Sequence, residues 1–156
     1  MSYRKNIKRL LDVLLFVALL PVLLIVALPV SIMIKREDKG SILYNGQRLG
    51  VGMLPFEMHK FRTMKENAQD IRNADGSTFN SDQDPRVTNI GRVLRQTSID
   101  ELPQLLNVLK GDMSFVGPRP SPLGNTHRYP DYYKTKFHVK PGITGLTQAL
   151  LRNSAS

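Results

Sequence analysis

The chain lacks the sequence signatures of several common types of functional site. It contains no cysteine, which excludes a disulfide framework and a thiolate metal site and fits a reducing compartment. It has no Walker-type phosphate loop and no Gly-x-Gly-x-x-Gly after a strand, and Gly50-Val51-Gly52 is expected to form only a turn. His59, His127 and His138 lack the spacing of zinc ligands, so we interpret each as structural. Disulfide-stabilised, zinc-dependent and dinucleotide-binding proteins are therefore not expected.

Acidic residues are scarce relative to basic ones. The sequence has 13 Asp+Glu against 22 Lys+Arg, a net charge of +9. This balance favours anionic partners, namely nucleic acid, anionic lipid headgroups or phosphorylated substrates, and does not choose among them. With 156 residues, the chain has room for one domain and an anchor but not for two full domains.

The most prominent segment is an uncharged apolar run, Val13–Ile34. As a helix it would extend roughly 33 Å, about the thickness of one hydrocarbon core. A cleaved signal peptide is the alternative, but such peptides have a shorter apolar region followed by small residues, and here Lys35-Arg36-Glu37 follows. We therefore expect a retained membrane anchor, residues 1–38, followed by one folded domain, residues 39–156.

The charges around the apolar run bear on its topology. Basic residues mark the cytoplasmic side of a membrane, and they occur on both flanks: Arg4, Lys5, Lys8 and Arg9 before the run, and Lys35, Arg36 and Lys39 after it. Pro21 lies near the middle, where it removes a helical hydrogen bond and bends the helix. A helix broken at Pro21 that enters and leaves by one face satisfies both observations. An ordinary span that tolerates the proline is the alternative.

Beyond the anchor the sequence predicts short elements. Ser41–Met64 is interpreted as a β-hairpin with its turn at Asn45-Gly46, a favoured turn dipeptide. Lys65–Arg72 is predicted to be a short polar helix, and Asn73–Pro85 a surface loop. From Phe115 onward, repeated glycine and proline predict rigid irregular loops. The expected fold class is α+β, mostly helical.

Two helices are predicted in the middle of the chain. Asn89–Thr97 is expected to be helical with a basic side. The next helix shows the i, i+3, i+4, i+7 spacing of a buried face and stops at Gly111; its apolar residues are Leu102, Leu105, Leu106 and Leu109. Pro103 is best tolerated in a first turn, which places the start of this helix at Ile99 or Asp100.

Asp100 and Glu101 are adjacent carboxylates at a predicted helix start, where such residues are commonly caps. Their surroundings favour a larger role, because residues 86–156 contain ten Lys+Arg and only four carboxylates. Carboxylates in a basic region pair with arginines, hold a divalent cation or attack an electrophile. An ionised aspartate is a competent nucleophile towards phosphorus.

Arg95 and Arg119 are the best candidates for binding phosphate, because guanidinium binds phosphate oxygens as a fork. Arg119 lies between two prolines, which restrict its backbone. A structural salt bridge of Arg119 with Asp112 or Asp131 is the alternative. Weaker candidates, with solvated side chains as the alternative, are Arg62, Arg86 and Arg92.

Taken together, these motifs closely resemble one family, the monotopic phosphoglycosyl transferases, also called bacterial sugar transferases. The resemblance covers almost the whole chain, in the family's order. The matching segments are Lys60-Phe61-Arg62-Thr63-Met64, Asp84-Pro85-Arg86-Val87-Thr88, Ser98-Ile99-Asp100-Glu101-Leu102-Pro103-Gln104-Leu105, Asn107-Val108-Leu109-Lys110-Gly111-Asp112-Met113-Ser114-Phe115-Val116-Gly117-Pro118-Arg119-Pro120 and Pro141-Gly142-Ile143-Thr144-Gly145-Leu146.

The resemblance implies a re-entrant helix hairpin broken at Pro21 and a small catalytic domain on the cytoplasmic face of the bacterial inner membrane. It implies that Asp100 attacks the sugar-bearing phosphate of a UDP-sugar, releases UMP and holds the phosphosugar until polyprenol phosphate displaces it. Asp100 and Glu101 would bind Mg²⁺, and Arg95 and Arg119 would contact phosphates. Anionic lipids and a second copy of the chain are further candidate partners.

The chain departs from the family pattern in two places. Many members have serine before the breaking proline, where this chain has Leu20. The family usually continues past Thr-Gly-Leu with Val-Asn-Gly-Arg-Asn and a further helical region, whereas here Ala149-Leu150-Leu151-Arg152-Asn153 follows and the sequence ends at Ser156. We therefore expect that the usual C-terminal extension, with its nucleotide contacts, is lacking.

Two alternatives to this enzyme stay open. One is a truncated, catalytically weak binding or scaffold copy of the same fold, which would release no UMP. The other is an anchored nucleic-acid-binding protein, suggested by the net charge and by tyrosines near Lys134 and Lys136. No recognition helix or stacking motif supports it, so nucleic acid is not expected as a partner.

Overall fold

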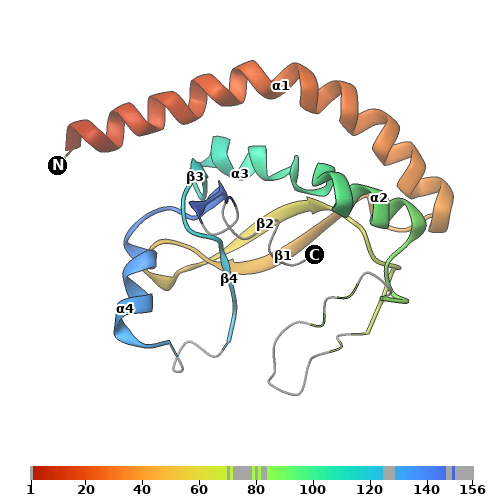
Figure 1. Ribbon diagram of the computed structural model, residues 1–156. Coiled ribbons are helices and arrows are strands. Elements are labelled where there is room, and N and C mark those ends of the chain that lie inside the picture. Colours follow the sequence, from red (N-terminus) through yellow and green to blue (C-terminus); the bar gives the residue numbers. More distant parts are fainter. Residues whose placement is uncertain are drawn as a thin grey trace.

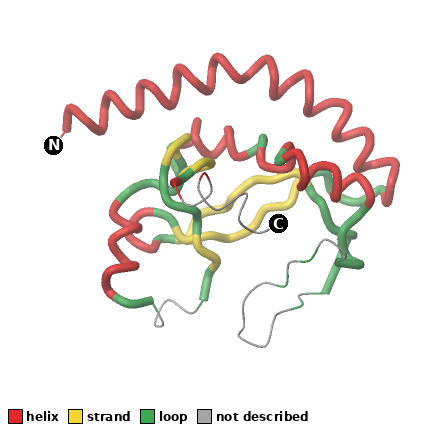
Figure 2. Tube along the Cα trace, in the orientation of Figure 1, coloured by secondary structure: helices red, strands yellow, loops and turns green. Residues whose placement is uncertain are grey.

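The computed structural model describes residues 2–69, 71, 79, 81, 84–124, 129–146 and 149, and side chains from residue 6 onward. Its architecture is α+β, with more residues in helices than in strands, as the sequence predicts (Figures 1 and 2). Its helices and strands are α1 (Ser2–Asp38), β1 (Leu43–Leu49), β2 (Pro55–Phe61), α2 (Asn89–Thr97), α3 (Gln104–Lys110), β3 (Ser114–Val116), β4 (Ser121–Pro122), α4 (Asp131–Lys134) and β5 (Gly142–Thr144), with 3₁₀ turns at Val51–Met53, Ile99–Glu101 and Thr135–His138.

α1 is one continuous helix that arches over α2 and α3 (Figure 1). It stays helical through Pro21 and Pro29 and curves gradually, so the structure does not show the predicted break at Pro21. A proline removes one hydrogen bond, and the surrounding apolar residues continue the helix on both sides. Asn6–Asp38 is long and apolar enough to cross a membrane, judged by length and composition. The re-entrant topology stays a prediction.

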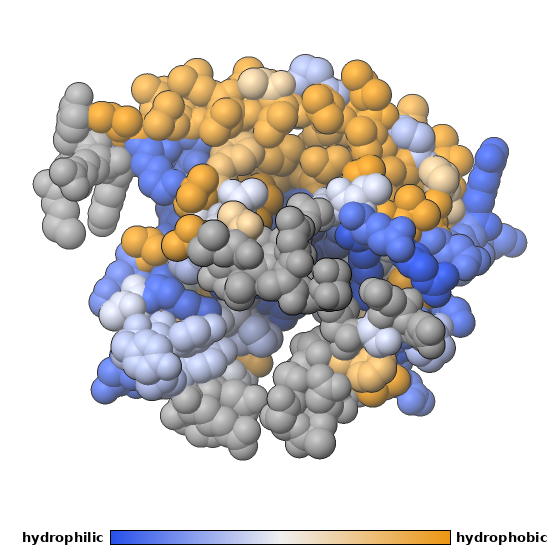
Figure 3. Space-filling view, viewed as in Figure 1, coloured by the Kyte–Doolittle hydropathy of each residue, from blue (hydrophilic) through white to orange (hydrophobic). Residues whose placement is uncertain are grey.

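The inner face of α1 packs on the rest of the molecule through two apolar clusters. Phe16 and Leu23 contact Leu105 of α3, and further along α1 a second pair, Val30 and Ile34, packs with Phe61 and Leu94. The outer face stays apolar and exposed, and it forms a continuous hydrophobic band over α1 (Figure 3). Exposed residues of this band include Leu10, Leu14, Leu24, Ile25 and Leu28.

Polar groups hold both ends of α1 to the same underlying domain. Near the start, the Arg9 guanidinium donates to two last-turn carbonyls of α3, those of Val108 and Leu109. Near the end, the Glu37 carboxylate accepts from the first two backbone N–H groups of α2, and Asp38 pairs with the buried Arg62. A cation at a helix C-terminus and an anion at a helix N-terminus both match the helix dipoles. Both ends of α1 are thus hydrogen-bonded to the same domain, at opposite ends of the molecule (Figure 1).

The predicted β-hairpin is present, but its turn lies elsewhere. β1 and β2 pair antiparallel from Leu43↔Phe61 to Leu49↔Pro55, so Asn45-Gly46 lies inside β1. The chain reverses after Gly50, where Gly52 (φ 65°) and Met53 (φ 61°) adopt the left-handed conformation that the turn requires. Gly46 lies beside the Tyr44 ring, where an added Cβ would be 2.9 Å from Tyr44 Cε1. Gly46 therefore lies in a strand, where it leaves room for the Tyr44 ring, and it is not part of the hairpin turn.

Two further predictions need correction. Residues 65–69 contain only a turn at Glu66–Asn67 and no helix, because Asn67 has φ 57°; most of Asn73–Pro85 lies outside the described residues. The region after Phe115 is not only irregular, since β3 pairs in parallel with β5 and β4 joins β1. Local sequence patterns do not show such short, non-local pairings.

Candidate active site

A sharp connection between α2 and α3 presents Asp100 and Glu101. α2 runs from Asn89 to Thr97 as predicted, and Ser98 (φ 58°) ends it in the left-handed conformation. One 3₁₀ turn, Ile99–Glu101, follows before α3 begins at Gln104. The continuous helix predicted from Ile99 or Asp100 is therefore interrupted, and both carboxylates line a cleft under α2.

Lys60 of β2 contacts both carboxylates. Its ammonium nitrogen, Nζ, lies 2.6 Å from Glu101 Oε1 and 3.7 Å from Asp100 Oδ2. Sequence reasoning placed Lys60 in a motif but assigned it no function. The sequence clue to Lys60 was its place at the start of the Lys-Phe-Arg-Thr-Met motif. Its contact with the two carboxylates could not be predicted, because it depends on how β2 lies beneath the turn that carries them. Lys60, Asp100 and Glu101 form the centre of the site.

The surroundings of Asp100 act on its pKa in opposite directions. The residue is 8% exposed, and this burial raises its pKa above the ordinary value. The Lys60 ammonium lowers the pKa, the Glu101 carboxylate raises it, and Arg95 lowers it. Lys60 and Arg95 therefore offset part of the effect of burial and favour the ionised form of Asp100. A poorly hydrated but ionised carboxylate is a reactive nucleophile.

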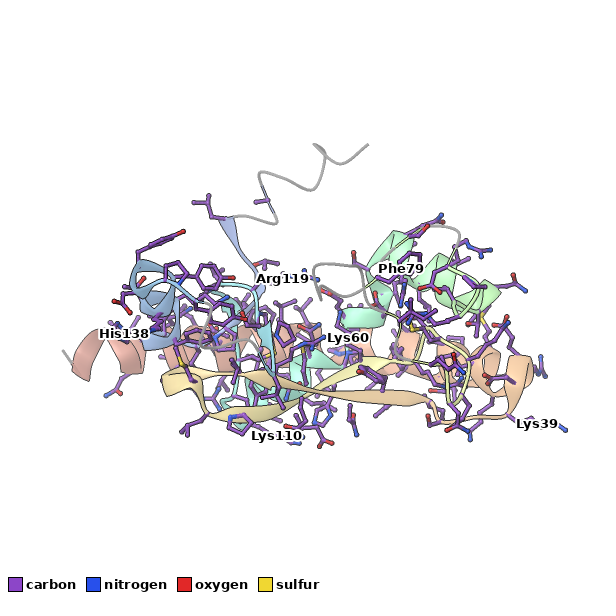
Figure 4. All side chains as sticks on the ribbon, turned by 90° about the horizontal axis from the view of Figure 1, so that it is seen from below. Lys39, Lys60, Phe79, Lys110, Arg119 and His138 are labelled. Carbon is purple, nitrogen blue, oxygen red and sulfur yellow. The ribbon has the colours of Figure 1, made fainter. Side chains whose placement is uncertain are left out.

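The cleft has a volume of about 1090 Å³ and is strongly basic. Arg95 and Arg119, the two predicted phosphate-binding residues, line it together with Asp100 and Glu101, so the structure brings all four residues into one site. Lys60 and Arg119 come from different elements and lie near the middle of the molecule (Figure 4). The other basic residues that line the cleft are Arg48, Arg62, Lys65, Arg86 and Arg92.

Arg95 and Arg119 are held in different ways. Arg95 is half-buried on α2, its Nε donates to Thr63 Oγ1 at 2.9 Å, and burial lowers its pKa while Asp100 raises it. Arg119 is exposed on the loop between β3 and β4. Within the described part of the chain it pairs with neither Asp112, which accepts from Asn107, nor Asp131, which pairs with Lys134. Arg119 therefore lines the cleft without either of the predicted structural partners.

Arg62 and Arg86, the weaker candidates, are buried and structural. Arg62 joins Asp38 to the carbonyls of Ser41 and Met64, and Arg86 binds Asp84 together with the carbonyls of Gln69 and Phe79. The two arginines lower the pKa of Asp38 and of Asp84 to about 2. A solvated position is thus wrong for both arginines. The third weaker candidate, Arg92, is exposed and lines the cleft.

Asp100 and Glu101 supply oxygen atoms of the kind that Mg²⁺ takes as ligands, although Glu101 Oε1 is bound by Lys60 Nζ. Mg²⁺ is commonly bound by one or two carboxylates plus substrate phosphates, keeping several waters. Asp100 and Glu101 supply two carboxylates in a basic cleft. No group of three or more His, Cys, Asp or Glu occurs in the described residues, so an all-protein metal cage is not present there.

Comparison with known proteins gives the same assignment as the motifs. The family model described as bacterial sugar transferase matches residues 3–156. A UDP-glucose:undecaprenyl-phosphate glucose-1-phosphate transferase of Caulobacter vibrioides is 44% identical over 151 residues, which are 90% of this chain and 52% of that protein. A UDP-N-acetylgalactosamine-undecaprenyl-phosphate N-acetylgalactosaminephosphotransferase of Aeromonas hydrophila is 39% identical over 92% of this chain and 34% of its own length.

A further relative is matched over more of its own length. The exopolysaccharide production protein ExoY of Sinorhizobium fredii is 39% identical over 96% of this chain and 71% of its own length. The chain spans about half or less of the length of most of the curated relatives it matches. The match covers the anchor, the carboxylate pair and both arginines in one continuous alignment with the family model. The chain therefore belongs to the bacterial sugar transferase family.

Proposed function

We propose that this protein transfers a phosphosugar from a UDP-sugar to polyprenol phosphate and releases UMP, as a membrane step in glycoconjugate synthesis. The observation that carries the proposal is a buried carboxylate, Asp100, held beside Lys60 in a basic cleft. The relatives' names support the substrates, because they specify UDP-sugars and undecaprenyl phosphate. The cleft's excess of cations suits two phosphorylated substrates.

The chemistry proceeds in two displacements at one phosphorus atom. A carboxylate oxygen of Asp100 attacks the sugar-bearing phosphorus, the bond from that phosphorus to the bridging oxygen breaks, and UMP leaves with the electron pair. A phosphate oxygen of polyprenol phosphate then attacks the same phosphorus and breaks its bond to Asp100. The products are polyprenyl diphosphosugar and the free carboxylate. Neither displacement requires a redox partner.

The residues around Asp100 have distinct functions in this scheme. Lys60 and Arg95 favour the ionised form of Asp100, and Lys60 also holds Glu101 through the 2.6 Å contact. Arg95 on α2 and Arg119 on the loop between β3 and β4 orient the phosphate oxygens in the cleft. Mg²⁺, when held by Asp100 and Glu101, would neutralise charge on the phosphates. Each residue thus acts on charge or position, while Asp100 forms the bond.

We propose that α1 lies in one leaflet of the bacterial inner membrane, with the catalytic cleft on the cytoplasmic face. Both ends of α1 are hydrogen-bonded to the same domain, through Arg9 and Glu37, while the outer face is apolar. A helix that crossed the bilayer would carry one of these ends away from its partner. The exposed basic residues after the apolar run, Arg36 and Lys39, would face anionic lipid headgroups. A homodimer stays a prediction.

The activity is tested by incubating the purified protein with Mg²⁺, polyprenol phosphate and a panel of UDP-sugars. We expect UMP release with at least one sugar and, without polyprenol phosphate, a protein adduct of phosphosugar mass. Asp100→Asn should abolish both, by several orders of magnitude, because the group that forms the bond is lost. Asp112→Asn is the matched control and should retain both. A protein that binds a UDP-sugar but releases no UMP would support the scaffold alternative.

The topology is tested by cysteine labelling, which is clean here because the chain has no native cysteine. Single cysteines at positions 2 and 39 are treated in intact cells with a membrane-impermeant thiol reagent; position 39 is used because a Cβ at Gly40 would lie 1.7 Å from Glu66 Oε2. Re-entry predicts that neither position is labelled until the cells are permeabilised. Labelling of one position from outside would show that α1 spans the membrane.

A further inference from the structure

A buried carboxylate lies in the first third of the apolar helix α1. Asp12 is 4% exposed, and its Oδ1 accepts hydrogen bonds from Ser114 Oγ at 2.9 Å and from the Phe115 backbone N–H at 3.2 Å. One turn earlier, Lys8 Nζ donates to Ser114 Oγ at 2.6 Å and to the Val116 carbonyl at 3.2 Å. A buried charge is costly unless it is paired. All four contacts reach one element, β3.

β3 leads directly to Arg119. The strand pairs in parallel with β5, and the chain beyond it stays pinned, since Gly117 N–H donates to the Thr144 carbonyl and Gly142 N–H donates to the Pro118 carbonyl, both at 3.0 Å. The backbones are in close contact there, because a Cβ on Gly142 would lie 2.1 Å from Gly117 N. Displacement of β3 would therefore displace Arg119, which follows Pro118.

Apolar packing alone would not set the position of β3 along α1. Phe16 and Leu23 dock α1 on Leu105, and such contacts tolerate sliding because they lack direction. Two hydrogen bonds from consecutive residues, Ser114 and Phe115, to one buried carboxylate do fix a register. The polar contacts therefore add a constraint that the hydrophobic clusters do not supply.

We propose that Asp12, supported by Lys8, is a positioning residue for the phosphosugar transfer: it fixes β3 on the membrane helix and thereby sets where Arg119 lies relative to Asp100. The inference rests on the proposed function of Arg119 in binding substrate phosphate. At the other end of α1, Glu37 accepts from the first N–H groups of α2, the helix that carries Arg95. The membrane helix thus holds both arginine-bearing sides of the cleft, and Asp12 serves the Arg119 side.

The test is a double-mutant cycle on the full chain in one detergent. Asp12→Ala should raise the KM for the UDP-sugar roughly tenfold, with a smaller change in kcat, because a charged hydrogen-bond acceptor is lost while Asp100 is untouched. In an Arg119→Ala background the same change should add little, whereas in an Arg95→Ala background it should keep its full effect. Equal effects in both backgrounds would overturn the proposal. Ser31→Ala, which removes only a bond to Ala27 within α1, is the control for a lost polar group.

A second readout does not depend on activity. Hydrogen exchange of residues 113–118 and 141–144 should become faster in Asp12→Ala, with α2 unchanged, and Asp12→Asn and Ser114→Ala should show smaller effects in the same segments. Unchanged exchange there, or equal acceleration throughout the chain, would overturn the link between Asp12 and β3. If the wild-type protein released no UMP, the proposed function would fail while this exchange experiment still decided the structural link.

Discussion

Gly91 provides a stringent test of how α2 sits on the domain. It lies in the first turn of α2, where an added Cβ would be 2.0 Å from the Thr63 carbonyl oxygen and 2.7 Å from the Thr63 carbonyl carbon. The same turn is held by the Thr88 side chain, which accepts from Gly91 N–H, and by Thr88 N–H, which donates to the Thr63 carbonyl. Alanine has a higher helix propensity than glycine, so Gly91→Ala would ordinarily stabilise the protein. The contact with Thr63 predicts that it destabilises the protein instead.

The sizes of the opposing free-energy contributions decide whether Gly91→Ala stabilises or destabilises the protein. Alanine gains about 1 kcal/mol over glycine in a helix. The clash is with backbone, so rotating a side chain cannot relieve it, and overpacking of this kind costs about 1–3 kcal/mol. If α2 moves away, the bonds of Thr88 N–H and Arg95 Nε to Thr63 are also lost, at about 1 kcal/mol each. The net loss is about 2–4 kcal/mol, which lowers Tm by roughly 4–16 °C at this chain length.

Thermal unfolding in one detergent measures the effect, with Val93→Ala as the matched control. Val93 lies on the same helix and is 52% exposed, so its change to alanine should alter stability by less than about 0.5 kcal/mol. Gly91→Ala should also raise the KM for the UDP-sugar, because α2 carries Arg95. A Tm for Gly91→Ala equal to or above that of the wild type would refute the contact between α2 and Thr63.

Two further predictions concern pH. Lys60→Met removes the cation that lowers the pKa of Asp100, so the acid limb of the kcat/KM profile should move to higher pH, with Lys60→Arg closer to wild type; a limb that stayed in place or moved to lower pH would contradict this assignment. Asp38 and Asp84 have pKa values of about 2 when folded and about 4 when unfolded, so their stabilisation should be complete above about pH 4 and lost as pH falls towards 2. Asp38→Asn should flatten the Tm–pH curve in that window, and an unchanged curve would argue against the ion pair with Arg62.

The sequence predicted best what local signals encode. α2 has the predicted bounds because Thr88, a good N-cap residue, precedes an amphipathic turn and its side chain accepts from Gly91 N–H. The stop of α3 at Gly111 (φ 94°) follows from glycine's freedom in the left-handed region. The hairpin was predicted, yet its turn was misplaced because Asn-Gly is also compatible with a strand when a tyrosine ring covers the glycine.

The parts that failed depend on contacts between distant segments. β3 and β5 are three residues long and have no period of their own, so only their mutual hydrogen bonds define them. In the site, residue type was enough to predict Asp100, Glu101, Arg95 and Arg119. Lys60 was assigned no function, because its partners are 40 residues away in the sequence. Residue type identifies the charged groups, but it does not show which of them form structural ion pairs, as Arg62 and Arg86 do.

The ends of α1 show why this distinction matters for topology. Counting basic flanks treats Arg9 as a charge that faces lipid headgroups, but its guanidinium binds the carbonyls at the C-terminus of α3. Glu37, which such counting ignores, caps α2. A charged side chain that is bound to a helix terminus says less about which side of the membrane it faces. Such side chains restrain the helix more directly, because separating either end from the domain would leave helix-terminal groups of α2 or α3 without partners. Entry and exit of α1 on one face stays a prediction, which these hydrogen bonds support together with the charge pattern.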